Sequence, residues 1–122
     1  MGAAAAWERG AKAERDKRWS EAEAGYAEAL RLEPKMTKAQ KHVARALAGQ
    51  NKLPEAAAMF VAYLAKEPKD TDALFELAEV QRKRGRMSEA FDLFTTYVQS
   101  EKREARKAYT DHAKRVLGGL TR

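Results

Sequence analysis

Apolar residues recur at helical spacing along the chain. The stretch EAEAGYAEALRLEP begins at Glu21, and its residues Ala22, Tyr26 and Leu30 lie at i, i+4 and i+8, on one face of an α-helix. The strict alternation of apolar and polar residues that indicates a half-buried strand is not found. The pattern therefore predicts seven helices and no strands, over about residues 3–16, 20–32, 37–49, 54–66, 71–84, 88–100 and 105–117.

Residues at several predicted helix starts fit known N-terminal signals. Ser20 with Glu23, and Thr37 with Gln40, have the spacing of a capping box, in which the two side chains bond to each other's backbone N–H groups. Pro54 suits a first helical turn, because the N–H group that proline lacks has no partner there. We therefore expect helices to begin at or next to these positions.

Residues that tolerate the left-handed backbone conformation mark the predicted turns. Asn51 and Gly85 occupy equivalent turn positions, and both residue types adopt this conformation readily at helix ends. Gly118 and Gly119 are expected to end the last helix.

The chain repeats itself with a period of 34 residues. Each period contains two predicted helices, and one helical hairpin cannot bury its own apolar face, so neighbouring hairpins are expected to share a continuous core. The residues that coincide under this shift are Gly10, Ala44 and Ala78; Ala22, Ala56 and Ala90; Tyr26, Phe60 and Phe94; and Pro34 and Pro68.

This helix–turn–helix period, with small residues, aromatics and proline at these offsets, resembles the tetratricopeptide repeat (TPR) family. The resemblance implies an all-α fold, a right-handed α-solenoid of TPR helical hairpins with seven helices. It also implies that the repeated small residues let helices approach closely and that the repeated aromatics fill the space between them. The expected domain is single, over residues 1–122, with repeats at about 3–36, 37–70 and 71–104 and a closing helix at about 105–118.

Three residues depart from the family pattern. Ala6 and Arg9 stand where the family usually has large apolar residues, which suggests an edge repeat or one that packs against something outside this chain. Lys102 replaces the third proline, which suggests that the last hairpin runs more continuously into the closing helix. The chain being part of a larger protein stays an open alternative.

Composition agrees with helices and bears on the partner class. The 122 residues include 25 alanines and no cysteine, and the net charge is +6 with 24 basic and 18 acidic residues. Because the two signs are interleaved, solvated helix faces explain the charge better than nucleic-acid binding does. The two candidate nucleic-acid patches are Gln81 to Arg86, and Lys102 and Arg103 with Arg106 and Lys107.

No catalytic or cofactor motif is found. His42 and His112 lie seventy residues apart without a metal-binding or nucleophile–base spacing. The glycines follow no phosphate-loop or dinucleotide-binding pattern. The sequence therefore predicts a non-catalytic protein with no cofactor and no metal.

In the TPR family, the first helix of each hairpin lines a concave groove, so the resemblance directs the search for a binding site to those helices. One row contains Trp7, Lys41 and Phe75 on those helices and Tyr109 in the closing helix, and its three aromatics are candidate anchors for a partner. The alternative is structural: Trp7 packs on a missing upstream repeat, and Tyr109 packs into the last hairpin.

Charged residues on the same helices complete the candidate site. A basic centre beside an acidic wall would bind a peptide carrying both signs of charge, although solvated helix charge is an equal alternative. The basic residues are Lys38, His42 and Arg45, and the acidic residues are Asp72, Glu76 and Glu79. The candidate partner-binding residues are Trp7, Lys38, Lys41, His42, Arg45, Phe75, Glu76, Glu79 and Tyr109.

One TPR subclass binds the acidic tails of heat-shock chaperones through a carboxylate clamp of Lys, Asn and Arg residues. The chain departs from that pattern, which disfavours a chaperone-tail adaptor. The departing positions hold Trp7, Ala11 and His42 in the first two repeats and Asp72 and Glu76 in the third.

The function predicted from these features is a protein-interaction module or scaffold that binds a partner segment of unknown identity in the groove. A self-assembling TPR array is the first alternative, and a basic nucleic-acid-binding adaptor is the less favoured one. No apolar run is long enough to insert into a membrane. We expect a cytoplasmic protein, with a periplasmic or membrane-anchored parent as alternatives, and the alanine- and arginine-rich composition suggests a bacterial source.

Overall fold

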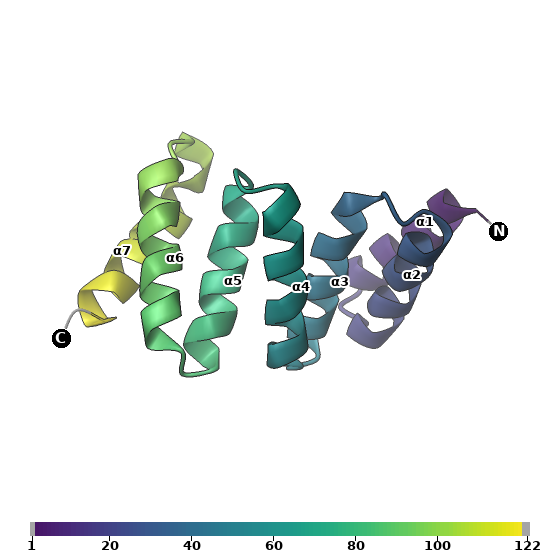
Figure 1. Cartoon of the computed structure of the whole chain (residues 1–122), viewed down its shortest axis with the longest axis horizontal. Coiled ribbons are helices and arrows are strands. Elements are labelled where there is room, and N and C mark those ends of the chain that lie inside the picture. Colours follow the sequence, from purple (N-terminus) through teal and green to yellow (C-terminus); the bar gives the residue numbers. More distant parts are fainter. Residues whose placement is uncertain (1, 121–122) are drawn as a thin grey trace. The chain divides into compact units, whose positions relative to one another are not determined.

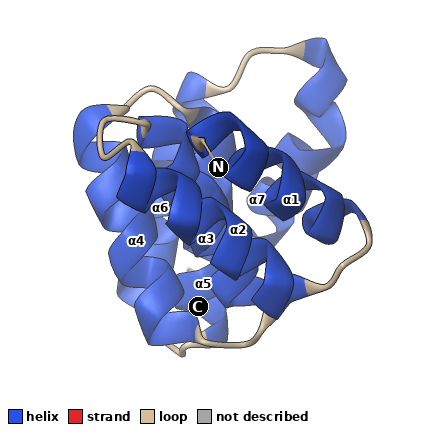
Figure 2. Ribbon diagram, turned by 90° about the vertical axis from the view of Figure 1, so that its right-hand side faces the viewer, coloured by secondary structure: helices blue, strands red, loops and turns tan. Residues whose placement is uncertain are grey.

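The structure, a computed structural model, describes residues 2–120. These residues form seven α-helices and one short 3₁₀ helix and contain no strand (Figures 1 and 2). The all-α class and the number of helices expected from the sequence are confirmed for this part of the chain. The elements are α1 (Ala3–Arg15), α2 (Trp19–Leu32), α3 (Thr37–Gly49), α4 (Leu53–Lys66), α5 (Thr71–Lys83), α6 (Met87–Ser100), η1 (Glu104–Arg106) and α7 (Lys107–Leu120).

The chain forms two compact units, which meet in the sequence between Lys66 and Glu67. In the first unit, α1 packs against α2, α2 against α3, and α3 against α4. In the second unit, α5 packs against α6, and α6 against α7. The grouping of these helices into three repeats of a single domain stays a prediction.

Small residues allow close contact between helices, as expected. A Cβ atom on Gly25 of α2 would lie only 2.5 Å from the backbone nitrogen of Gly10 on α1, so only glycine fits at this crossing. The repeated alanines are all fully buried. The repeated aromatics Tyr26, Phe60 and Phe94 have at most 1% of their surface exposed and fill the cores of their units.

The departure at Ala6 has a local explanation. Ala6 is fully buried, and its carbonyl oxygen lies 3.0 Å from the position of a Cβ atom on Gly25. A larger side chain at this close contact between α1 and α2 would require the helices to separate. Arg9, in contrast, is exposed to solvent.

Three turns in equivalent positions adopt the left-handed backbone conformation. Asn51 and Gly85 have φ values of 62° and 78°, which confirms the turn prediction. Lys17, 34 residues before Asn51, has a φ of 58° and was missed, because lysine carries no sequence signal for this conformation.

The predicted capping boxes are wrong. Helix α2 begins at Trp19, one residue before Ser20, and helix α3 begins at Thr37 itself, and neither has a side-chain N-cap. A side-chain cap forms at Asp70, which accepts a hydrogen bond of 3.1 Å from the Ala73 N–H at the start of α5. Pro54 lies in the first turn of α4, as predicted.

Two expectations for the C-terminal region are also wrong. Helix α6 ends at Ser100 and three non-helical residues follow, so Lys102 does not make the hairpin continuous with the closing helix. Gly118 and Gly119 do not end α7, which continues through both to Leu120. Neither glycine has a positive φ, so the left-handed stop that the sequence suggested does not form there.

Candidate functional site

Five of the nine candidate residues lie in the first unit and four in the second. In the first unit they come from α1 and α3, and in the second from α5 and α7. Each set is described within its own unit.

In the first unit, Trp7 is the centre of an aromatic cluster. Its ring centroid lies 4.8 Å from those of Tyr26 and His42, in edge-to-face arrangements with interplanar angles of 65° and 78°. The ammonium group of Lys38 lies 4.5 Å from the Trp7 ring centroid, a cation–π contact. Because Trp7 is only half-buried and Lys38 is exposed, this contact lies at the surface.

The sequence analysis missed Glu14, which connects three helices of this unit. Its Oε1 accepts a 2.5 Å hydrogen bond from the Tyr26 hydroxyl on α2 and lies 2.9 Å from Nδ1 of His42 on α3. Its other oxygen lies 3.8 Å from the Arg45 guanidinium. The sequence signal was weak, since Glu14 follows Trp7 by seven residues, on the same helix face, within a stretch of mixed charge.

These contacts set the protonation state of the cluster. Burial opposes ionisation of Glu14, but the hydrogen bonds from His42 and Tyr26 outweigh it, so the pKa of Glu14 lies below its ordinary value. Burial and the bond to Glu14 raise the pKa of Tyr26 well above its ordinary value. The predicted basic centre thus contains an ionised carboxylate between two of its members, His42 and Arg45.

Lys41 lies apart from the Trp7 cluster. Its ammonium group lies 5.9 Å from the ring centroid of Tyr63 on α4. Helix α3 therefore directs Lys38 and Lys41 toward different aromatic rings, one on α1 and one on α4.

In the second unit, Phe75 is the centre of a larger aromatic cluster. Its ring contacts Phe94 and Tyr97 of α6 and Tyr109 and His112 of α7, at centroid distances between 5.2 and 5.8 Å. Tyr109 is 50% exposed, whereas Phe75 is less exposed and lies between the buried and the exposed residues in accessibility. Phe75 thus supports the fold of this unit, and Tyr109 presents its ring to solvent.

Two of the three residues of the predicted acidic wall, Asp72 and Glu79, have basic partners within the second unit. Asp72 accepts hydrogen bonds from Arg103 and Arg106 at 3.1 to 3.3 Å. Glu79 accepts a 3.0 Å hydrogen bond from Arg82 and lies 2.7 Å from Nε2 of His112. The predicted acidic wall is therefore largely neutralised within its own unit.

Glu101 is a second acidic residue that the sequence analysis missed. It is 6% exposed and accepts hydrogen bonds from Arg103 and Thr71. The Arg103 side chain is the main cause that lowers the pKa of Glu101 to about 2, against the opposing effect of burial. This carboxylate ties the segment before α7 to the start of α5.

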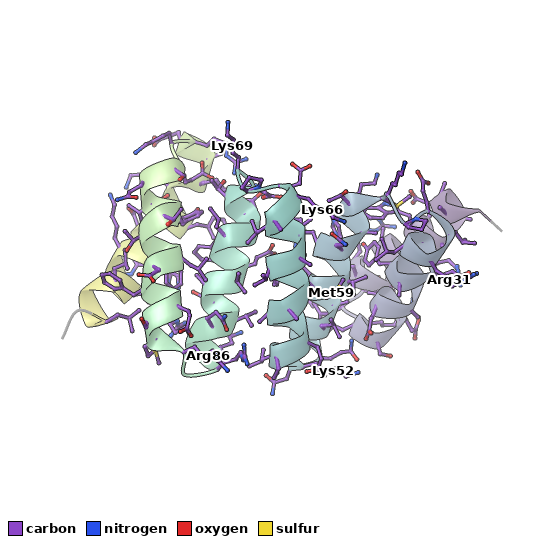
Figure 3. All side chains as sticks on the ribbon, in the orientation of Figure 1. Arg31, Lys52, Met59, Lys66, Lys69 and Arg86 are labelled. Carbon is purple, nitrogen blue, oxygen red and sulfur yellow. The ribbon has the colours of Figure 1, made fainter. Side chains whose placement is uncertain are left out.

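The two basic patches are also partly paired. Arg82, Arg84 and Arg86 bond to Glu79, Gln81 and Glu89, and Arg103, Arg106 and Lys107 bond to acidic residues of the second unit. Arg31 and Lys66, two of the cations labelled in Figure 3, lie in the last turns of α2 and α4, where the helix dipole stabilises positive charge. Pairing leaves less positive charge for a phosphate backbone.

Within residues 2–120, no group of three or more His, Asp or Glu side chains is placed to hold a metal ion. None of the helices in this range is long and apolar enough to cross a membrane.

Comparison with known families identifies the class of protein. Residues 43–109 match the family model described as Tetratricopeptide repeat. This match covers more than half of the chain, and the chain belongs to the tetratricopeptide repeat family. The family consists of protein-interaction modules that are generally non-enzymatic. No curated protein matches the chain in a sequence search.

Solved structures agree with this assignment. The TPR2B domain of yeast Sti1, in complex with pHsp70, is 18% identical over 98% of this chain and 95% of its own, with a TM-score of 0.84. The first TPR of Spaghetti (RPAP3), bound to the HSP90 peptide SRMEEVD, is 17% identical over 98% and 94%, with a TM-score of 0.85. PcrH from Pseudomonas aeruginosa is 13% identical over 98% and 92%, with a TM-score of 0.85. At these identities the likeness concerns the fold, and it confirms the fold class of TPR helical hairpins.

Proposed function

We propose that the chain is a non-catalytic protein-interaction module that binds a segment of a partner protein through the first helices of its hairpins and the closing helix α7. The single observation that carries the proposal is the exposed aromatic surface at Tyr109, set on Phe75 in a family of interaction modules. The proposed binding residues are Trp7, Lys38, Lys41, His42 and Arg45 in the first unit and Phe75, Glu76, Glu79 and Tyr109 in the second.

In the first unit, Trp7 is the proposed anchor, and the Lys38 ammonium lies over its ring. The Lys38 ammonium lies 4.5 Å from the Trp7 ring centroid. A partner carboxylate that draws Lys38 away would leave the indole face open to an apolar side chain. Tyr26 and His42 fix the ring from its edges, so little conformational entropy would be lost on binding.

In the second unit, Tyr109 is the proposed contact and Phe75 its support. The Arg106 guanidinium lies 5.8 Å from the Tyr109 ring centroid, which places a cation beside an exposed aromatic ring. Aromatic and arginine side chains are the types that contribute most to binding energy at interfaces.

Two structural neighbours support capture of a partner segment, because one is a complex with pHsp70 and the other is bound to an HSP90 peptide. A chaperone tail itself is disfavoured as the ligand. Trp7, His42, Asp72 and Glu76 replace residues of the carboxylate clamp, and two of these replacements are acidic.

The alternative functions have less support. The exposed residues Arg9 and Lys12 of α1 and Lys114 and Arg115 of α7 are all positive, which disfavours direct pairing of these two helices between copies of the chain. Nucleic-acid binding would have to compete with the internal ion pairs of the basic patches. The proposed location stays cytoplasmic.

The test is affinity capture from extract of the source organism, treated with nuclease. The wild-type chain is compared with a Lys41→Ala, Tyr109→Ala double variant and with a control carrying Lys66→Ala and Leu32→Ala, which change an exposed cation and an exposed apolar residue elsewhere. Phe75→Ala is avoided because that ring holds the second unit together. The proposal predicts a protein retained by wild type and control and lost with the double variant, and equal retention by all three contradicts it.

A further inference from the structure

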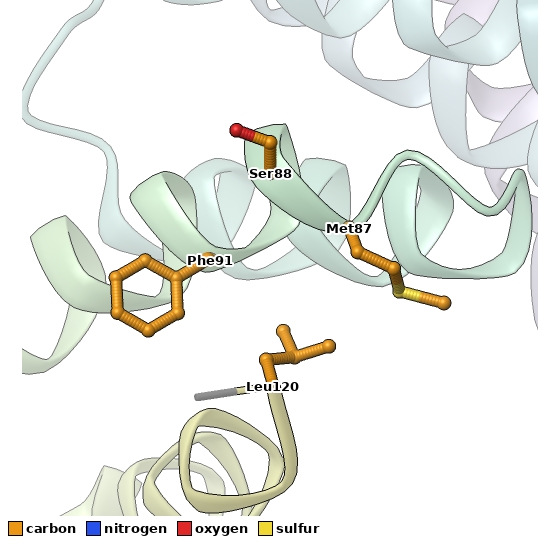
Figure 4. Close-up of a pocket in the computed structure, with 4 residues that line it drawn as sticks. All are labelled: Met87, Ser88, Phe91 and Leu120. Carbon is orange, nitrogen blue, oxygen red and sulfur yellow. The ribbon is translucent and has the colours of Figure 1, made fainter. Parts of the chain in front are cut away.

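An open apolar cleft lies between α6 and α7, outside the proposed binding residues. Its lining side chains are Met87, Ser88 and Phe91 of α6 and Leu120 at the end of α7, and its volume is about 330 Å³ (Figure 4). Met87 is 46% exposed. Apolar side chains left open to water in this way gain free energy when another apolar group covers them.

The first unit contains the equivalent junction in a closed form. Two repeat periods, or 68 residues, separate the corresponding positions of the two units. Met87 on α6 thus corresponds to Trp19 on α2, and Leu117 on α7 corresponds to Gly49 on α3. A Cβ atom on Gly49 would overlap the Trp19 indole, so the ring lies directly on the bare glycine backbone. In the first unit, the chain itself thus supplies a large aromatic ring to this junction.

Polar contacts also close the junction in the first unit. The Gln50 side chain donates a 2.8 Å hydrogen bond to Glu23, and the Lys52 ammonium lies 4.0 Å from the same carboxylate. In the second unit, the residues 68 positions after Glu23 and Lys52 are Phe91 and Leu120, and Leu120 lies within α7 whereas Lys52 lies beyond the end of α3. These apolar side chains cannot form the polar contacts, and Met87 supplies no ring.

We propose that the cleft between α6 and α7 binds an aromatic side chain of a partner polypeptide, at the junction that corresponds to the one Trp19 covers in the first unit. The volume is sufficient, because a cavity of about 150 Å³ already holds benzene. This cleft is a second contact point, separate from Trp7 and Tyr109. The proposal for the cleft does not depend on whether those residues bind a partner.

The charge beside the cleft defines the partner further. Helix α6 contains two charged residues, Glu89 and Asp92, and both are exposed and acidic. Glu89 lies 3.9 Å from the guanidinium of Arg86, the residue before Met87, so among the described residues the unpaired charge on α6 is that of Asp92. Asp92 follows the lining residue Phe91 directly and has no ion pair among residues 2–120. The occupant is therefore an aromatic residue with Lys or Arg next to it, since a positive charge there complements α6.

The test uses the full chain with ¹³C-labelled methionine methyl groups. Four methionines are present, and Met36 and Met59 report on the first unit while Met87 reports on the cleft. The probes are the blocked tripeptides Lys-Trp-Lys, Glu-Trp-Glu and Lys-Ala-Lys. We expect Lys-Trp-Lys to shift the Met87 signal with a dissociation constant on the order of millimolar, because a tripeptide buries few atoms. Glu-Trp-Glu should bind about tenfold more weakly, and Lys-Ala-Lys should leave the signal in place.

The matched variants are Met87→Trp, which fills the cleft as Trp19 does in the first unit, and Leu32→Trp, which adds an exposed ring elsewhere. Loss of binding in Met87→Trp, followed through Leu120 methyl signals, and its retention in Leu32→Trp support the proposal. It is overturned if Lys-Trp-Lys shifts Met36 and Met59 equally, if Met87→Trp binds as wild type does, or if Glu-Trp-Glu binds as tightly. A Met87 signal that moves with protein concentration alone overturns it as well, since a second copy would then fill the cleft.

Discussion

Tyr26 and Glu14 are joined by a hydrogen bond of 2.5 Å between the phenol hydroxyl on α2 and the carboxylate on α1. The same carboxylate oxygen lies 2.9 Å from His42 on α3. A single acidic side chain thus connects three helices of the first unit, and it bonds to the two residues, Tyr26 and His42, whose rings contact Trp7.

Replacing Tyr26 with phenylalanine tests this connection. Tyr26→Phe keeps the buried ring but removes the hydroxyl, and a hydrogen bond to a charged group contributes about 1.5–3 kcal/mol. We expect the free energy of unfolding to fall by about that amount at pH 7 in urea denaturation. Tyr109→Phe is the matched control, because that residue is half-exposed, and it should change stability by less than about 0.5 kcal/mol. Equal effects of the two variants would exclude the role given to Glu14.

The stability of the second unit should depend on acid pH through Glu101. Folding lowers the pKa of this carboxyl from 4.5 to about 2, so its contribution is complete above about pH 4.5 and is lost as the pH falls toward 2. In Glu101→Gln, urea denaturation between pH 2 and 7 should show lower stability at neutral pH and a weaker loss in acid. A variant with the same pH profile as wild type would contradict this assignment.

Gly25 should not tolerate a larger residue. In Gly25→Ala, the new Cβ atom would lie 2.5 Å from the Gly10 nitrogen and 2.7 Å from its Cα atom, so α1 and α2 must separate. We expect a loss of at least about 1–3 kcal/mol in unfolding free energy. Gly119→Ala is the control, since its Cβ atom meets nothing within 4 Å and the residue lies inside α7. That change should stabilise the chain by about 0.5–1 kcal/mol.

Lys17 should gain from replacement by glycine. Its φ of 58° is a conformation that costs an L-residue with a side chain about 1–2 kcal/mol, and glycine recovers part of that cost. Lys17→Gly is expected to raise the unfolding free energy by up to about 1 kcal/mol, measured in urea. Gly85→Ala, at the equivalent turn with a φ of 78°, should lower it by a similar amount. Changes of the same sign in both variants would refute the equivalence of the two turns.

The fold could be predicted from the sequence because the residues that repeat every 34 positions are the buried ones. Gly10, Ala22 and Tyr26 coincide with their partners one and two periods later, and packing requires such residues to be small or large at fixed places. Helix starts were harder, because Trp19 and Thr37 begin their helices without a side-chain cap and tertiary packing decides the boundary.

The site was predicted less completely. Trp7 and Tyr109 were selected from their place in the repeat, and their role in binding stays a prediction. Glu14 bonds to a histidine 28 residues away and Glu101 bonds to Thr71, 30 residues away, and neither was predicted. Such pairings depend on which helices pack together. They also changed the predicted charge pattern, since Glu14 lies among the basic residues and Arg103 and Arg106 pair with Asp72.

Site-specific photo-crosslinking tests the central claim, partner binding by the first helices and the closing helix α7, most directly. A benzoylphenylalanine is placed at Tyr109, at Lys41 and, as a control on α4, at the 55% exposed Val61, and each chain is irradiated in extract of the source organism. The account predicts that one partner protein crosslinks to positions 109 and 41 and not to position 61. Crosslinks from position 61 alone, or to the chain itself at all three positions, would contradict it.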